Sequence, residues 1–329
     1  MRIVKLRLLF AAILLAPASF AAPPAPQPVT HRGGEPERYP AWRAAAVASL
    51  IERGDAYSFA TAAALMFAAT APSMQAEGLV LAGRASAIDP QNAAIGWLRL
   101  RLCVLAAGCD VRASATDMRW LDAENAAAWL PTLTAAYRDR DATEVDRVLM
   151  DMAQTRRFDL YWNRIIVLLF ESLRGAEKVL PGGLRTTDAS RLALVEGIAA
   201  TEIVPRFAAL IDACRDPGAG TERRETCLKV SKLMQQSDAT PVQLAGLAME
   251  RHMLPVDGRE ARALAERRHV IEWRTATSAK FDAPLLPWLK NAHARWRLAR
   301  MKSLRREEDV AIAILREQGM PLDPPKEAR

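Results

Sequence analysis

Hydrophobic residues recur at helical spacing along nearly the whole chain after residue 40. Trp42, Ala46 and Leu50 share one face of a first segment, and Phe59 and Phe67 share one face of a second. Such spacing is typical of amphipathic α-helices, whereas strands alternate with a period of two. We therefore predict an all-α protein of about fourteen helices with no significant sheet. The predicted helices cover residues 42–51, 59–67, 79–88, 92–105, 114–121, 125–137, 143–154, 160–180, 187–214, 222–236, 240–253, 259–277, 285–304 and 309–318.

Proline and glycine mark the ends of these helices. Pro205 lies inside the segment 187–214 and is expected to kink it or divide it in two. The strongest break, at residues 181–183 (Pro-Gly-Gly), separates short helices from longer ones. We therefore predict two helical sub-domains at 40–181 and 184–319, followed by a loose tail at 320–329.

A short motif occurs twice, 33 residues apart. Residues 88–94 (Ile-Asp-Pro-Gln-Asn-Ala-Ala) lead into Trp97, and residues 121–127 (Leu-Asp-Ala-Glu-Asn-Ala-Ala) lead into Trp129. Trp162 follows after a similar step. A period of this size is about the length of one helix-turn-helix unit, and such units stack into solenoids. The alternative is that the tryptophans are unrelated core anchors of a helical bundle.

The repeated units resemble the tetratricopeptide repeat over about residues 75–165. Pro90 stands near the end of a helix that contains Ala82 and Ala85, and Trp97 follows, as a proline, small residues and an aromatic do in that family. The second unit departs from the pattern, because Ala123 replaces the proline. The resemblance implies a right-handed superhelix of helical hairpins with a concave binding face. The polar residues expected on its inner helices, as candidates for contact with a partner, are Asn92, Arg99, Asn125 and Arg138.

The first 21 residues have the features of a secretory signal peptide. Arg2, Lys5 and Arg7 precede an unbroken apolar run at 8–15, and cleavage is expected after Ala21. Residues 22–39, rich in proline and glycine, are predicted to be a disordered spacer. The predicted location is therefore periplasmic or secreted.

The four cysteines fit an oxidising compartment. Cys103 and Cys109 are six residues apart, and Cys214 and Cys227 are thirteen apart. Pairing of sequence neighbours is the simplest of the three connectivities, and Cys214–Cys227 would clamp a helical hairpin. Neither spacing is that of a metal site. Hairpins pinned by cystines also resemble the Sel1-like branch of the tetratricopeptide superfamily.

Positive charge is concentrated near the C-terminal end. The chain carries a net charge of +7, and residues 251–306 contain 14 Lys and Arg against 5 Asp and Glu. Such a stripe would suit an anionic lipid, lipopolysaccharide or an acidic protein, although a solvated basic face is the alternative. Nucleic acid is not expected outside the cytoplasm. The candidate residues are Arg267, Arg268, Arg295, Arg297, Arg300, Lys302, Arg305 and Arg306.

No familiar catalytic motif occurs in the chain. The four histidines lie far apart, and no nucleophile-elbow, phosphate-loop or zinc-protease sequence is present. We therefore expect no catalytic residue, metal or cofactor. The predicted function is that of an exported helical-repeat module that binds an unidentified envelope protein or peptide. The alternatives are an envelope enzyme that acts on glycan or peptidoglycan, with two carboxylates in one cleft, and a peripheral binder of anionic membranes.

Overall fold

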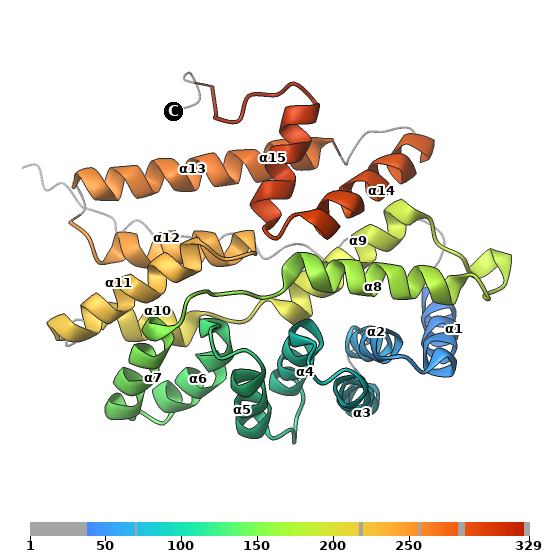
Figure 1. Ribbon diagram of the computed structural model, residues 1–329, viewed down its shortest axis with the longest axis horizontal. Coiled ribbons are helices and arrows are strands. Elements are labelled where there is room, and N and C mark those ends of the chain that lie inside the picture. Colours follow the sequence, from blue (N-terminus) through green and yellow to red (C-terminus); the bar gives the residue numbers. More distant parts are fainter. Residues whose placement is uncertain (1–37, 70, 217–219, 256–257, 282–286, 326–329) are drawn as a thin grey trace, which may run out of the picture.

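The computed structural model describes residues 38–69, 71–216, 220–255, 258–281 and 287–325. Within these ranges the protein is all-helical and has no strand, apart from one isolated parallel bridge between Asn125 and Arg157 (Figure 1). The fold class expected from the sequence is confirmed at this level. The α-helices are α1 (Arg38–Arg53), α2 (Ala56–Phe67), α3 (Pro72–Ile88), α4 (Ala93–Leu105), α5 (Val111–Leu121), α6 (Leu130–Arg138), α7 (Ala142–Gln154), α8 (Trp162–Glu177), α9 (Asp188–Ile198), α10 (Ala208–Arg215), α11 (Thr221–Gln235), α12 (Thr240–His252), α13 (Arg259–Lys280), α14 (Pro287–Ser303) and α15 (Glu307–Glu317).

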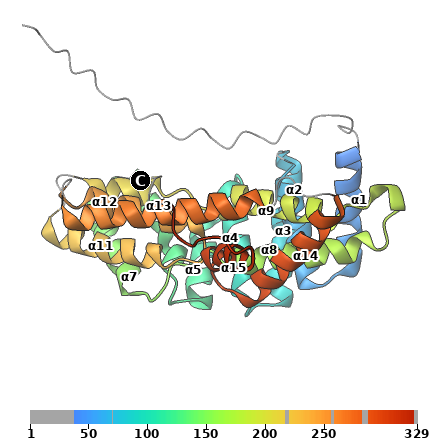
Figure 2. The ribbon, with the colours of Figure 1, turned by 90° about the horizontal axis from the view of Figure 1, so that it is seen from above.

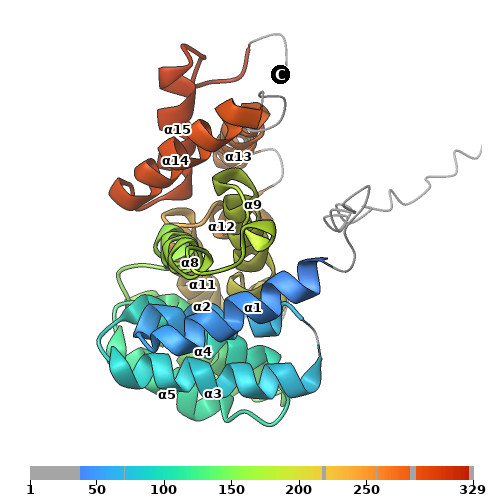
Figure 3. The same ribbon diagram turned by 90° about the vertical axis from the view of Figure 1, so that its right-hand side faces the viewer.

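The helices form three tiers (Figures 1 and 3). The first tier is α1 to α7, in which each helix packs on the next. Helices α8 to α12 lie above it, with α8 on α1, α2 and α4, and with α11 on α7. Helices α13 to α15 form the third tier, and the view from above shows α13 lying along α12 (Figure 2). Segments distant in sequence therefore meet between the tiers.

Local signals set most helix boundaries. Gly54 ends α1 in the left-handed conformation, which a glycine adopts without steric cost. Pro72 occupies the first position of α3, so this helix begins seven residues before the predicted start at 79. At Gly78 the backbone of α3 comes so close to Phe67 that an added Cβ would lie 2.9 Å from its ring. Small residues thus allow α2 and α3 to pack tightly.

The predicted long helix at 187–214 is divided before Pro205. The regular helix α9 ends at Ile198, a single π-helical turn (η3, Ala199–Ile203) follows, and α10 begins at Ala208. Proline disfavours the helical conformation in the preceding residue and lacks an N–H. The buried Arg101 side chain donates hydrogen bonds to the carbonyl oxygens of Ile203 and Val204, both at 3.1 Å. These bonds satisfy carbonyls that the broken helix leaves unpaired.

A buried ion pair joins α1, α8 and α9. Glu177 at the end of α8 binds Arg191 of α9, and both side chains are at most 5% exposed. The same carboxylate accepts a hydrogen bond of 3.1 Å from Nε1 of Trp42 on α1 and one of 2.6 Å from Thr186. This cluster fixes the first helix against the second tier.

One hydrophobic core runs through the molecule. It extends without interruption from Trp42 in α1 to Ile314 in α15 and therefore crosses the break at 181–183. The division into two helical sub-domains at residues 181–183 stays a prediction. Trp97 and Trp162 are buried in this core, and Trp129 is partly buried against it. The recurring tryptophans thus serve packing.

Both predicted cysteine pairs lie at disulfide distance. The sulfur atoms of Cys103 and Cys109 are 1.97 Å apart, and those of Cys214 and Cys227 are 2.01 Å apart. Two such pairs are compatible with an oxidising, extracytoplasmic location. In the described ranges no helix is both long and apolar enough to cross a membrane.

The predicted signal peptide lies outside the described residues, as does the spacer up to residue 37. The last two residues of the predicted spacer, Arg38 and Tyr39, belong to α1. The predicted boundary was therefore two residues too late. Of the tail predicted at 320–329, residues 321–325 contain no helix, and residues 326–329 lie outside the described part.

Candidate binding cleft

The motif repeated in the sequence forms the same turn twice. Asp89 ends α3 and Asp122 ends α5, with φ/ψ of −127°/73° and −146°/74°. Three residues later, Asn92 and Asn125 each cap the next helical segment, and each side-chain oxygen accepts hydrogen bonds from the following backbone N–H groups. Asn92 begins α4, and Asn125 begins a 3-10 turn (η1, Ala126–Trp129) that leads into α6. An Asp-x-x-Asn sequence thus carries both local structures, as N-cap preferences predict.

The second turn is covered by an extended segment of the chain itself, residues 156–161, which links α7 to α8. The side-chain amide of Asn125 donates a hydrogen bond of 3.0 Å to the carbonyl oxygen of Asp159, and its side-chain oxygen accepts one of 2.9 Å from the backbone N–H of Asp159. Arg157 and the phenol of Tyr161 both bind the Asp122 carboxylate. Burial and the neighbouring Asp122 raise the pKa of Tyr161, so the phenol stays protonated and donates. The turn is therefore closed to other ligands.

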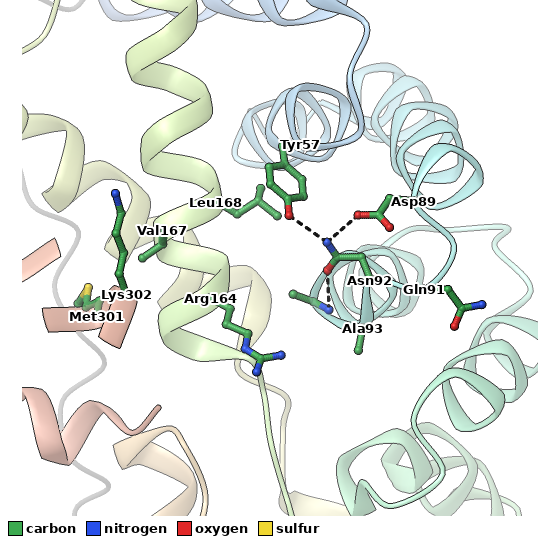
Figure 4. Close-up of a pocket in the computed structure, with 11 residues that line it drawn as sticks. Tyr57, Asp89, Gln91, Asn92, Ala93, Arg164, Val167, Leu168, Met301 and Lys302 are labelled. Atoms are coloured by element: carbon green, nitrogen blue, oxygen red, sulfur yellow. Dashed lines mark hydrogen bonds between the residues drawn. The ribbon is translucent and has the colours of Figure 1, made fainter. Parts of the chain in front are cut away.

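The first turn instead faces an open cleft with a volume of about 540 Å³. Figure 4 shows this cleft between the α3–α4 turn and α2 on one side and α8 on the other, with α14 at its far end. The lining residues are Tyr57, Asp89, Gln91, Asn92, Ala93, Ala94, Arg164, Val167, Leu168, Met301 and Lys302.

The cleft has an apolar floor and a charged rim. Leu168 and Met301 are buried, and Val167 is half-buried beside them. Lys302 is already paired with Glu171 at 2.6 Å. Arg164 is exposed, and no carboxylate in the described ranges lies within ion-pair distance of it. The lining can therefore bury an apolar side chain and offer a charge to a ligand at the same time.

A hydrogen-bonded triad shapes the rim at the turn. The side-chain amide of Asn92 donates a hydrogen bond of 2.9 Å to the carboxylate of Asp89 and one of 3.4 Å to the phenol oxygen of Tyr57 (Figure 4). No Lys, Arg or His of the described residues forms an ion pair with Asp89. The carboxylate of Asp89 is thus free to take a cation from a ligand.

The four polar residues predicted to contact a partner do not lie on one surface. Asn92 lines the cleft. The prediction for Asn125 is wrong, because this residue is fully buried beneath the 156–161 segment. Arg99 points from α4 to Asp117 of α5 at 3.4 Å, and the exposed Arg138 binds its neighbour Asp139. Neither lines the cleft.

The residues of the predicted basic stripe form ion pairs within the molecule, and Arg267 and Arg306 share one carboxylate, that of Glu308. Each of the eight has a carboxylate partner, for example Asp188 for Arg295 at 3.4 Å and Glu196 for Arg297 at 2.8 Å. The other six pair with carboxylates of α8, α13, α15 and the α7–α8 linker. This arrangement favours the solvated, internally paired face over an anion-binding stripe.

Two neighbouring carboxylates lie in the interior. Asp238, before α12, accepts hydrogen bonds of 2.8 Å from the backbone N–H groups of Leu160 and Trp162, and Asp159 binds Arg305 at 2.5 Å. Burial, reinforced by the charge of Asp159, raises the pKa of Asp238 to about 7. Both carboxylates are buried and engaged by the chain's own donors, so their arrangement is structural. No group of His, Cys, Asp and Glu able to hold a metal ion occurs among the described residues.

Sequence reasoning missed most of the cleft. Tyr57, Arg164 and Met301 come from α2, α8 and α14, and only the packing of the tiers brings them together. Asp89 had a visible signal, because it belongs to the repeated motif. We found no match for this chain among protein-family models, curated proteins or solved structures.

Proposed function

We propose that the protein is an exported, tetratricopeptide-like interaction module that binds a segment of a partner protein in the cleft at the α3–α4 turn. The observation that carries this proposal is the open cleft of about 540 Å³, with an apolar floor next to a charged rim. Protein-binding sites combine an apolar anchor pocket with polar groups at the edge that fix orientation.

Two further features support this proposal. Helices α1 to α7 pack in sequence order, and the same turn recurs 33 residues along, as expected of stacked helical hairpins. The two cystines agree with a position in the cell envelope or outside the cell. The signal-like residues 1–21 would direct the chain there.

Site-specific photo-crosslinking tests the proposal. A photoreactive phenylalanine analogue replaces Tyr57, which lines the cleft and is 47% exposed, or Tyr137 of α6, which is 40% exposed and lies outside it. Both proteins are made in the native cell and irradiated. We expect a discrete crosslinked protein from position 57 and none from position 137, because the two positions differ in location and hardly in exposure.

A blocking variant connects the crosslink to the cleft. Val167→Trp places a large ring on the cleft floor and is expected to abolish the crosslink from position 57. Its folding is checked by the helical circular dichroism signal. Equal crosslinking from both positions, or a crosslink that persists in the folded Val167→Trp protein, would refute the proposed function.

A further inference from the structure

The two repeated turns present the same set of side chains. At the first turn, Asn92 donates to Asp89 and to the phenol oxygen of Tyr57. At the second, Asn125 donates 3.3 Å to the phenol oxygen of Tyr161, which itself binds Asp122. Each turn thus combines an aspartate, an asparagine and a tyrosine, although the two tyrosines come from unrelated parts of the chain.

The second turn demonstrates what its aspartate and asparagine bind, because Tyr161 itself belongs to the segment 156–161 that covers this turn. The backbone N–H of Ala126 donates 2.9 Å to the carbonyl of Arg157, and the N–H groups of Arg156 and Arg157 donate to the carbonyl of Glu124 at 3.2 and 3.1 Å. These bonds add residues 156–157 as an extended, parallel strand-like segment to the turn. The ligand of the second turn is therefore a stretch of extended peptide.

Among the described residues, the corresponding backbone groups of the first turn have no hydrogen-bond partner. Gln91 stands at the position of Glu124, and Ala93 at that of Ala126. In the described part of the chain, neither the carbonyl of Gln91 nor the N–H of Ala93 forms a hydrogen bond, and both residues line the cleft. Extended peptides commonly bind proteins by completing such unpaired backbone edges.

We infer that the Asp89–Asn92 turn binds an extended segment of a partner protein in the way that the Asp122–Asn125 turn binds residues 156–159 of this chain. This inference rests on the proposed function and specifies its ligand. The backbone of the segment pairs with Gln91 and Ala93, and its side chains follow a basic, apolar, acidic order.

The order of side chains follows from charge and burial. In the chain's own segment, Arg157 binds Asp122, Phe158 is fully buried and Asp159 binds an arginine. The cleft offers the same three groups. Asp89 is available for a basic residue, the floor at Leu168 and Met301 for an apolar side chain, and Arg164 for a carboxylate. A basic-apolar-acidic triplet therefore complements the cleft in both charge and polarity.

A peptide with the chain's own sequence is the probe. Fluorescein-labelled Thr155–Tyr161 (Thr-Arg-Arg-Phe-Asp-Leu-Tyr) and the same peptide with Arg157→Glu are titrated with the full-length protein, and fluorescence anisotropy is recorded. We expect the wild-type protein to bind the first peptide about tenfold more tightly than the second. Asp89→Lys is expected to reverse this preference, because the charge that the peptide meets is reversed.

Two further variants control for folding and position. Asp139→Lys makes the same change at an exposed aspartate outside the cleft and should leave the preference unchanged. Asp89→Asn removes the charge with little change in shape, and it should bring the two peptides to similar affinity. Binding of the charge-reversed peptide by Asp89→Lys would itself demonstrate that this variant is folded.

The outcomes separate this inference from the proposed function. Absence of binding of the Thr155–Tyr161 peptide, or binding that ignores the charge at position 89, overturns the inference. A random heptapeptide library selected in parallel on wild-type and Val167→Trp proteins tests the cleft alone. Selected peptides that depend on the open cleft but lack the triplet would leave the proposed function standing without the inference, and no cleft-dependent peptide would contradict both.

Discussion

The buried ion pair between Glu177 and Arg191 provides the sharpest test of the fold. In Glu177→Gln the retained Oε1 still accepts hydrogen bonds from Trp42 and Thr186, which both contact that atom. The new amide, however, places N–H groups against the guanidinium that Oε2 now binds. Removing one partner of a buried pair costs about 3–5 kcal/mol. Asp188 also contacts Arg191, at 2.6 Å, so we expect the lower end, about 3 kcal/mol.

The assay is urea unfolding followed by circular dichroism at pH 7 without reductant. For a chain of this size a loss of about 3 kcal/mol corresponds to a decrease in melting temperature of about 6 °C. Glu171→Gln is the matched control, because it makes the same change on α8 at a surface pair with Lys302. That variant should lose less than about 1 kcal/mol. The double variant Glu177→Gln/Arg191→Met should recover part of the loss, because it removes the unpaired charge.

A loss below about 1 kcal/mol in Glu177→Gln would refute this reasoning, since such a value is typical of exposed pairs. A loss in Glu177→Gln as small as that in Glu171→Gln would do the same. Either result would mean that water reaches Arg191 in solution and that α1 and α9 are not held as the structure has them.

Three other predictions follow from the packing and the charges. Gly246→Ala should lower the free energy of unfolding by about 1–3 kcal/mol, because an added Cβ would lie 2.7 Å from a side chain of α11. Gly83→Ala should raise it by about 0.5–1 kcal/mol, because a Cβ added there meets nothing within 4 Å. Changes of the same sign for the two variants in urea unfolding would contradict this prediction. Burial raises the pKa of Asp238 to about 7, so between pH 4 and 7 the folded state keeps a proton that the unfolded state has released; the stability that this proton gives is complete below about pH 4, falls as the pH rises and is lost above 7. The free energy of unfolding should therefore fall more steeply between pH 4 and 7 for the wild type than for Asp238→Asn. Replacing Cys214 and Cys227 by serine should cost about 3 kcal/mol, and non-reducing peptide mapping of the wild type should recover this pair.

The sequence predicts the helices well because their boundaries are encoded locally. Helix α7 was expected at 143–154 and is observed at Ala142–Gln154, since Asp141 caps its start. Prediction was poorer where tertiary contacts decide the outcome. The 3-10 turn after Asn125 was expected as regular helix, and the π-helical turn before Pro205, where Arg101 binds the free carbonyls, was not expected, although the break at Pro205 itself was. Boundaries set by distant residues leave no periodic signal.

The cleft was only partly predictable for the same reason. Of the two asparagines in the repeated motif, Asn92 lines the cleft and Asn125 is buried, although their local sequences are nearly the same. The difference lies in residues 156–161, which cover the second turn. Equal sequences encode equal turns, but whether a turn is exposed depends on segments elsewhere in the chain.

The linker between α7 and α8 has a consequence for the order of assembly. Asp238, which lies 77 residues after Tyr161, binds the backbone of this linker. Arg305, which lies 146 residues after Asp159, binds the Asp159 side chain. A ribosome that adds about 5–20 residues per second would deliver Asp238 roughly 4–15 s after Tyr161. Throughout that interval the linker can bind Asp122 and Asn125, which precede it, but it still lacks Asp238 and Arg305. A chaperone acting on the nascent chain would therefore meet the apolar and aromatic side chains of Phe158, Leu160 and Tyr161, which the mature protein buries.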